Sequence, residues 1–167
     1  RAYEADGAKL KKQIDGFFTS KEGPDFKPSE NAGKPIKGLV APTYDLKQAG
    51  PIYAWGYKEL QEATQPDVYV IIGTAYAGLD NLFAVTDKDF ETPLIRERFP
   101  VAFEEDLCHQ AEHAIEFQLP FLQQIVGARK PFTIVPILCS FSALSMAEAP
   151  VQQSVEVFLA GLRDILK

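Results

Sequence analysis

The sequence is short of positive charge and of long apolar runs. Its 167 residues include 17 Lys and Arg against 23 Asp and Glu, for a net charge of −6. An acidic chain is repelled by a phosphate backbone, so we expect no binding to nucleic acid. The apolar runs fall well short of the ~20 residues that a membrane-spanning helix needs, and we expect no membrane span.

The sequence is also poor in cysteine. Cys108 and Cys139 are its two cysteines, and they form neither a CxxC motif nor a zinc-binding spacing. A chain of this length with so few cysteines is not built on a disulfide framework, which favours a reducing compartment, and we expect a cytoplasmic location. Because the chain begins with Arg1 rather than Met, we also expect a processed or trimmed start.

The composition is typical of a compact globular domain, with 46% hydrophobic and 24% charged residues. We expect one domain that spans residues 1–167. Three short apolar runs rich in β-branched residues predict buried strands: Ile36–Ala41, Asp67–Ile72 and Phe132–Leu138. A helical period at Ile52–Leu60 joins the first two runs into a strand–helix–strand unit. We therefore predict an α/β fold, a three-layer sandwich with a mainly parallel central sheet flanked by helices.

The remaining segments complete this expected architecture. Residues 8–18 have the apolar spacing of an amphipathic helix, whereas residues 19–35 are rich in Gly and Pro and predict a loop. Leu82–Val85 is a further short strand, and His109–Val126 reads as helical with a break near Pro120. A last helix is expected at Val151–Leu166, with these side chains inward: Val155, Phe158, Leu159, Leu162 and Leu166.

The densest group of polar side chains lies between Cys108 and Glu116. On a continuous helix, four of them would share one sector of about 100°: His109, Glu112, His113 and Glu116. The pattern H-x-x-E-H also matches the inverted zinc-protease signature, but no further histidine follows as a third ligand. We favour a structural interpretation, in which Glu112 and Glu116 accept hydrogen bonds that orient neighbouring loops.

A second candidate site lies where the first two predicted strands end. Ligands of open parallel sheets bind beyond the carboxyl ends of the strands, so the loops 42–45 and 73–78 should lie side by side. Their side chains able to bind a ligand are Thr43, Tyr44, Asp45, Thr74 and Tyr76. Hydroxyls with a single carboxylate make a poor transition-metal site. The alternative is an ordinary turn in which Asp or Thr caps a helix.

In chain order, these segments resemble the Memo family, whose fold is similar to that of class III extradiol ring-cleaving dioxygenases. The run from Ile36 to Pro42 resembles the family strand that ends in Pro-His-Ala-Gly, and Val70-Ile71-Ile72-Gly73 resembles the strand that ends in Gly-Pro-Ser-His. Glu91-Thr92-Pro93-Leu94 resembles its Thr-Pro-Leu turn. The most specific likenesses are Glu112-His113-Ala114-Ile115-Glu116 to Glu-His-Ser-Leu-Glu, and Leu119-Pro120-Phe121-Leu122 to Leu-Pro-Phe-Leu.

The resemblance identifies two histidines as the family's metal ligands, and both are replaced here. The histidine of Pro-His-Ala-Gly corresponds to Thr43, and the histidine of Gly-Pro-Ser-His corresponds to Tyr76. Typical members also continue for a further half, with a Ser-Ser-Asp-x-x-His stretch and a late Cys, which this chain lacks. An iron or copper centre needs about three protein ligands, and hydroxyls do not replace imidazole at neutral pH.

Two hypotheses follow. The favoured one is a non-catalytic Memo-like domain that binds an unidentified protein or small molecule and holds neither metal nor other cofactor. The alternative is an acid–base enzyme, or one dependent on a divalent metal such as iron, with Glu112, His113 and Glu116 as catalytic residues beside Asp45 and Tyr76. The sequence indicates no oligomeric state.

Overall fold

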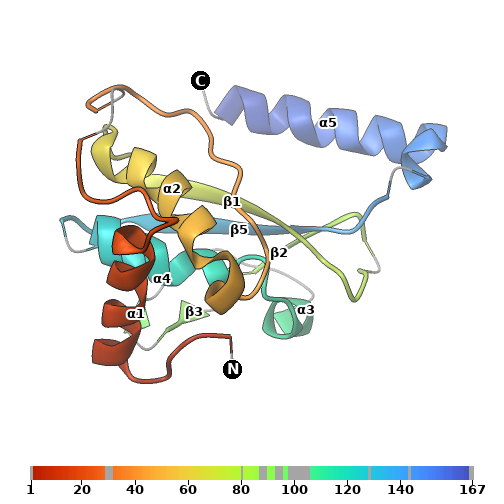
Figure 1. The fold of residues 1–167 in the computed structure, drawn as a ribbon. Helices are drawn as coiled ribbons and strands as arrows, with labels where there is room; N and C mark the ends of the chain where they lie inside the picture. Colours follow the sequence, from red (N-terminus) through yellow and green to blue (C-terminus); the bar gives the residue numbers. More distant parts are fainter. Residues whose placement is uncertain are drawn as a thin grey trace.

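The computed structural model describes residues 2–28, 32–79, 81–86, 90–92, 96–97, 106–127, 129–142 and 144–165. These residues form a mixed α/β structure with a small open sheet (Figure 1). The α-helices are α1 (Gly7–Thr19), α2 (Leu46–Glu62), α3 (Asp106–Ala111), α4 (Leu119–Leu122) and α5 (Ala149–Ile165). Short 3₁₀ or π turns are η1 (Glu116–Gln118), η2 (Gln123–Gly127) and η3 (Ser145–Ala147). The strands are β1 (Val68–Thr74), β2 (Phe83–Val85), β3 (Phe90–Glu91), β4 (Arg96–Glu97) and β5 (Thr133–Cys139). None of the described helices is both long and apolar enough to cross a membrane.

The main sheet has the strand order β1-β5-β2. β1 and β5 are parallel, in a register that runs from Val68 opposite Thr133 to Thr74 opposite Cys139. β2 is antiparallel to β5, and β3 and β4 form a separate antiparallel pair. The described strands thus make a mixed sheet, and the expected three-layer sandwich with a mainly parallel sheet is not confirmed.

The strands at Asp67–Ile72 and Phe132–Leu138 are confirmed to within two residues, but the strand expected at Ile36–Ala41 is wrong. This segment has no regular secondary structure and makes no ladder with β1. Among the described strands, β1 therefore lies at the edge of the sheet rather than at its centre. The prolines that bracket the segment cannot donate to a ladder, and Gly38 weakens a strand further. The segment instead lies along α2, where Leu39 contacts Gly56.

The main core fills the face of the sheet that carries Tyr69, Ile71 and Ile134, which we call the front face. Helices α1, α2 and α4 pack against it. Phe121 of α4 is stacked between Tyr53 and Tyr57 of α2, with ring centroids 5.1 Å apart in each pair. Parallel rings at this separation bury much apolar surface, so this stack fixes α2 over the sheet.

Helices α1 and α2 cross closely at Gly50. A Cβ atom built on Gly50 would overlap the ring of Phe17. We expect Gly50→Ala to lower the free energy of unfolding by about 1 kcal/mol, since overpacking costs about 2 kcal/mol and the better helix propensity of alanine returns about 1 kcal/mol. Urea unfolding measures this. Gly16→Ala in α1 is the matched control, because its Cβ meets nothing within 4 Å, and it should be stabilising.

The opposite face of the sheet, which we call the back face, carries Val68, Val70, Ile72 and Phe83. Helix α5 lies on this side, away from α1 and α4 (Figure 1). Val155 is its buried residue, while Phe158 and Leu162 are half-buried. The expected inward Leu159 is exposed instead, and Leu166 lies outside the described residues. Within the described residues, one loosely packed helix, α5, therefore covers the back face.

The helix expected at His109–Val126 is broken earlier than predicted. α3 ends at Ala111, and helical structure resumes only at Glu116 with η1, followed by α4 and η2. Pro120 does not cause this break, because it lies in the first turn of α4, where its missing N–H costs no hydrogen bond. The polar residues of this segment are consequently not displayed on one continuous helix face.

Candidate functional site

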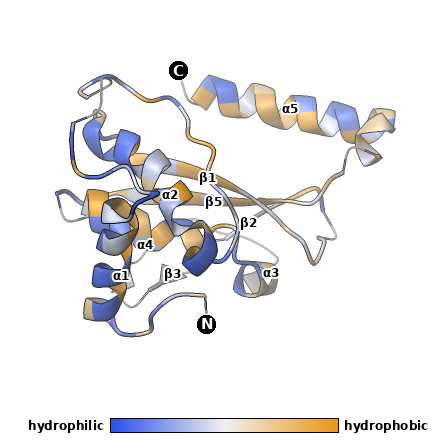
Figure 2. Cartoon of the chain, viewed as in Figure 1, coloured by the Kyte–Doolittle hydropathy of each residue, from blue (hydrophilic) through white to orange (hydrophobic). Residues whose placement is uncertain are grey.

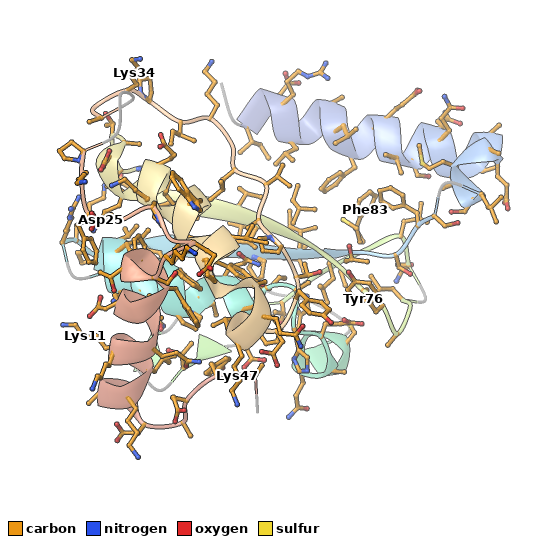
Figure 3. The ribbon with its side chains drawn as sticks, in the orientation of Figure 1. Lys11, Asp25, Lys34, Lys47, Tyr76 and Phe83 are labelled. Atoms are coloured by element: carbon orange, nitrogen blue, oxygen red, sulfur yellow. The ribbon has the colours of Figure 1, made fainter. Side chains whose placement is uncertain are left out.

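The loops 42–45 and 73–78 lie side by side, as expected, although no strand precedes the first of them. Thr43 Oγ1 and Tyr76 OH are 2.9 Å apart and share a hydrogen bond, which joins the loop before α2 to the loop after β1. Figure 3 shows Tyr76 beyond the end of β1. Both hydroxyl groups are solvent-accessible, and 72% of Tyr76 is exposed. The two positions at which the family resemblance places histidine are thus bridged directly by two hydroxyls.

The other three residues expected at this site have different roles. Asp45 is the N-cap of α2, and its Oδ1 accepts a hydrogen bond of 2.7 Å from the backbone N–H of Lys47. Tyr44 keeps its ring in solvent, while its backbone carbonyl accepts from Tyr53 OH at 3.1 Å. Thr74 is exposed on the back face of β1. Asp45 therefore fits the capping alternative, and Tyr44 is an exposed tyrosine next to Thr43 in the sequence.

Glu112 holds the loop after β1. Its side chain is buried just past the end of α3, and its Oε1 accepts a hydrogen bond of 2.7 Å from the backbone N–H of Ala77. Gly73 makes room for this approach, because a Cβ there would lie 2.9 Å from the Cβ of Ala114. A carboxylate that accepts a backbone N–H forms a strong, charge-assisted bond. Glu112 therefore links the segment after α3 to the end of β1.

His113 and Glu116 lie together at the surface. His113 Nδ1 is 3.2 Å from Glu116 Oε2, and its exposed ring stacks on Phe117. Glu116 Oε1 accepts a hydrogen bond from Tyr3 OH. Burial, followed by the hydrogen bond to Glu116 and its charge, raises the pKa of Tyr3 above its ordinary value, so this phenol remains a proton donor. Glu116 ties the N-terminal segment to η1.

His109 does not share a face with His113, contrary to expectation. His109 is buried on α3, whereas His113 lies beyond the end of that helix with its side chain 62% exposed. A metal site of the H-x-x-E-H type needs both imidazoles on one helix. Because α3 ends at Ala111, His109 and His113 are not on one helix.

Gln118 is the site residue that the sequence did not reveal. Its Nε2 donates to the backbone carbonyls of Pro42, at 3.0 Å, and Ala114, at 3.2 Å, and its Oε1 accepts from Tyr57 OH at 2.9 Å. It thereby holds the loop before α2 against the segment that follows α3. The available signal was a single amide within an otherwise apolar stretch, because a buried amide needs hydrogen-bond partners.

These residues do not fit the iron or copper centre that the fold family implies. The two positions that should supply imidazole are hydroxyls bonded to each other, and Glu112 Oε1 is engaged by a backbone amide. In the described part of the chain, no three His, Cys, Asp or Glu residues gather closely enough to hold a metal ion. Burial raises the pKa of Cys139 to about 11, which keeps this thiol protonated at neutral pH.

The Thr43–Tyr76 hydrogen bond is exposed, so its removal is expected to cost little. We expect Tyr76→Phe and Thr43→Val each to lower the free energy of unfolding by less than about 1 kcal/mol. A double-mutant cycle measured by urea unfolding should give a small favourable coupling between the two positions. Tyr44→Phe is the matched control. A coupling of zero would show that the hydroxyl pair does not form in solution.

Comparison with known proteins agrees with the segments described above. The family model described as Memo-like protein matches residues 1–159. The chain is 35% identical to a MEMO1 family protein of Methanopyrus kandleri, over 93% of this chain and 59% of the relative. It is 30% identical to a MEMO1 family protein of Sulfolobus acidocaldarius, over 98% of this chain and 63% of the relative. The chain thus spans about three fifths of the length of these curated relatives, and it belongs to the Memo family.

Proposed function

We propose that this chain is a non-catalytic Memo-family domain that binds a partner at the rim formed by Thr43, Tyr44 and Tyr76. The observation that carries the proposal is the 2.9 Å hydrogen bond between Thr43 and Tyr76. It joins the two hydroxyls at the positions where the family resemblance places metal-binding imidazoles. Glu112, Glu116 and Gln118 support the same conclusion, because each makes a hydrogen bond to a neighbouring loop or terminal segment.

The exposure of the rim favours binding over chemistry. Tyr44 and Tyr76 are 60% and 72% exposed, whereas an enzyme site normally encloses its substrate and excludes water. Tyrosine offers a large apolar ring and a hydroxyl on a side chain with few rotamers, which suits it to protein interfaces. The partner class that this rim fits best is therefore a protein surface or a small molecule that stacks on tyrosine and accepts hydrogen bonds.

The test of the non-catalytic assignment is metal content. We expect the protein, purified without chelators, to contain far less than one iron, copper or zinc per chain by elemental analysis. Added Fe²⁺, Cu²⁺ or Zn²⁺ should leave its melting temperature unchanged, since binding to the native state alone would raise it. A metal present at about one per chain and lost in His113→Ala would overturn the proposal.

One observation favours the alternative, an acid–base enzyme. His113 Nδ1 lies 3.2 Å from Glu116 Oε2 at the surface, and an imidazole paired with a carboxylate is a common arrangement for proton transfer. In that case His113→Ala would abolish turnover, and Tyr76→Phe would lower it less. Under the binding proposal the dependence is reversed, and Tyr76→Ala weakens partner binding while His113→Ala matters less.

A further inference from the structure

The break between α3 and η1 is confined to a short junction. α3 ends at Ala111, and the backbone N–H of Phe117 already donates to the carbonyl of His113 at 3.0 Å, which is the pairing of an α-helix. Ile115 also has a helical backbone conformation, with φ −89° and ψ −46°. The two helical segments are therefore separated only at Glu112 and His113.

The sequence of this junction favours a helix. Residues 111–116 contain no glycine and no proline, and alanine and glutamate are good helix formers. η1 is a 3₁₀ turn, and such a turn between helical segments often marks a hinge or a strained sequence. The bent conformation must therefore be held by contacts with other parts of the chain.

Glu112 makes one of these contacts. Its Oε1 accepts the 2.7 Å hydrogen bond from the backbone N–H of Ala77, and charge-assisted hydrogen bonds are stronger than neutral ones. If the helix that includes His113 continued back into α3, Glu112 would lie one turn before Glu116 on the same helix face. Its carboxylate would then lie beside that of Glu116 and could not hold Ala77.

The part of the chain that follows the junction is fixed on the core. Ala114 and Ile115 are buried, and a Cβ atom on Gly73 would lie 2.9 Å from the Cβ of Ala114. The residues of α4 are buried as well, and Figure 2 shows most of this helix as hydrophobic. α3 lies on the other side of the junction, well away from α1 (Figure 1). A change at the junction would therefore turn α3 and leave α4 in place.

We propose that the junction at Glu112 and His113 is a two-state hinge that controls the loop 73–78. In the closed state, which is the observed one, the junction is bent and Glu112 holds the loop through Ala77. In the open state an unbroken helix spans residues 106–118, and Glu112 releases the loop. A side-chain hydrogen bond in one state is exchanged for backbone hydrogen bonds in the other, so the balance is small enough for both states to be populated.

The hinge regulates the rim of Thr43, Tyr44 and Tyr76. Tyr76 belongs to the loop that Glu112 releases, whereas Thr43 belongs to the loop 42–45, which Gln118 holds through the carbonyl of Pro42. Opening of the hinge therefore frees Tyr76 to leave Thr43 and weakens the rim as a binding surface. This consequence rests on the proposed function, but the hinge itself does not.

The test compares two variants that differ in helix propensity. His113→Ala and His113→Gly both remove an exposed imidazole and keep Glu112, but alanine favours a helix about fivefold over glycine. The readout is amide hydrogen exchange at Ala77, measured by NMR, with the amide of Ile137 in the middle strand β5 as the reference for global unfolding. Relative to Ile137, Ala77 should exchange about fivefold faster in His113→Ala than in His113→Gly, because the helical state releases it.

A purely structural junction predicts the opposite sign. Glycine loosens a bent segment more than alanine does, so Ala77 would then exchange faster in His113→Gly. That result, or equal rates in the two variants, would overturn the proposal.

A second pair of variants tests the open state itself. Glu112→Ala and Glu112→Gly both remove the hydrogen bond to Ala77, and again they differ in helix propensity. The Cα chemical shifts at residues 112 and 113 should become helical in Glu112→Ala but not in Glu112→Gly. Non-helical shifts in both variants would contradict the hinge. Neither pair requires a partner or a metal, so a failed hinge is distinguishable from a failure of the proposed function.

Discussion

Replacing Lys58 with methionine is expected to lower the free energy of unfolding by about 3 kcal/mol, the loss typical of removing one partner from a buried ion pair. Lys58 is buried in α2, and its Nζ lies 3.1 Å from Glu62 Oε1. The same ammonium donates to the backbone carbonyls of Asp25, at 3.1 Å, and Lys27. Methionine keeps the apolar stem and removes all three contacts at once.

Lys47→Met is the matched control, because Lys47 lies on the same helix with its side chain in solvent. Its unfolding free energy should stay within about 0.5 kcal/mol of the parent value. Lys58→Met should also speed proteolysis within residues 20–28, since Lys58 anchors this loop to α2. If Lys58→Met unfolds at the same urea concentration as Lys47→Met, the buried contacts do not stabilise the native state.

Glu112→Ala is expected to cost about 2 kcal/mol of unfolding free energy. The substitution removes a buried carboxylate and leaves the backbone N–H of Ala77 without its acceptor. The loop that carries Tyr76 should become more mobile, which hydrogen exchange at Ala77 would report. Glu112→Gln keeps an oxygen acceptor at this position, so most of the stability should return.

Alanine substitutions of the neighbouring His113 and Glu116 should cost less unfolding free energy than Glu112→Ala. His113→Ala should cost less than about 0.5 kcal/mol, because the imidazole is exposed. Glu116→Ala should lie between the two, because it loses the hydrogen bond from Tyr3. Equal melting of all three variants and the parent would refute the structural role of this segment.

The parts of the fold that sequence patterns predicted are those in which burial is local and periodic. The nearly continuous β-branched runs of β1 and β5 and the helical spacing of apolar residues in α1, α2 and α5 can each be seen within a single segment. Ile36–Ala41 is an apolar run like β1, but whether such a run joins the sheet depends on where the rest of the chain places it. That placement depends on contacts between distant segments, which the local sequence pattern does not contain.

The candidate site was likewise predictable only in part. Thr43 and Tyr76 do meet, as predicted, but the expected reason is wrong for Thr43, because no strand precedes its loop. The break after Ala111 was not predictable, because alanine, glutamate and histidine carry no helix stop signal. The bond from Glu112 to Ala77 joins residues 35 apart in sequence, and only the folded arrangement brings them together.

We propose that hydroxyls at positions 43 and 76 stand where other members of the family hold a metal, and a zinc titration tests this most directly. The parent protein and the double variant Thr43→His/Tyr76→His would be titrated with Zn²⁺ by calorimetry. Because imidazole is a good zinc ligand and a hydroxyl is not, the variant should bind at least 100-fold more tightly than the parent. Parent binding as tight as that of the variant would contradict the account.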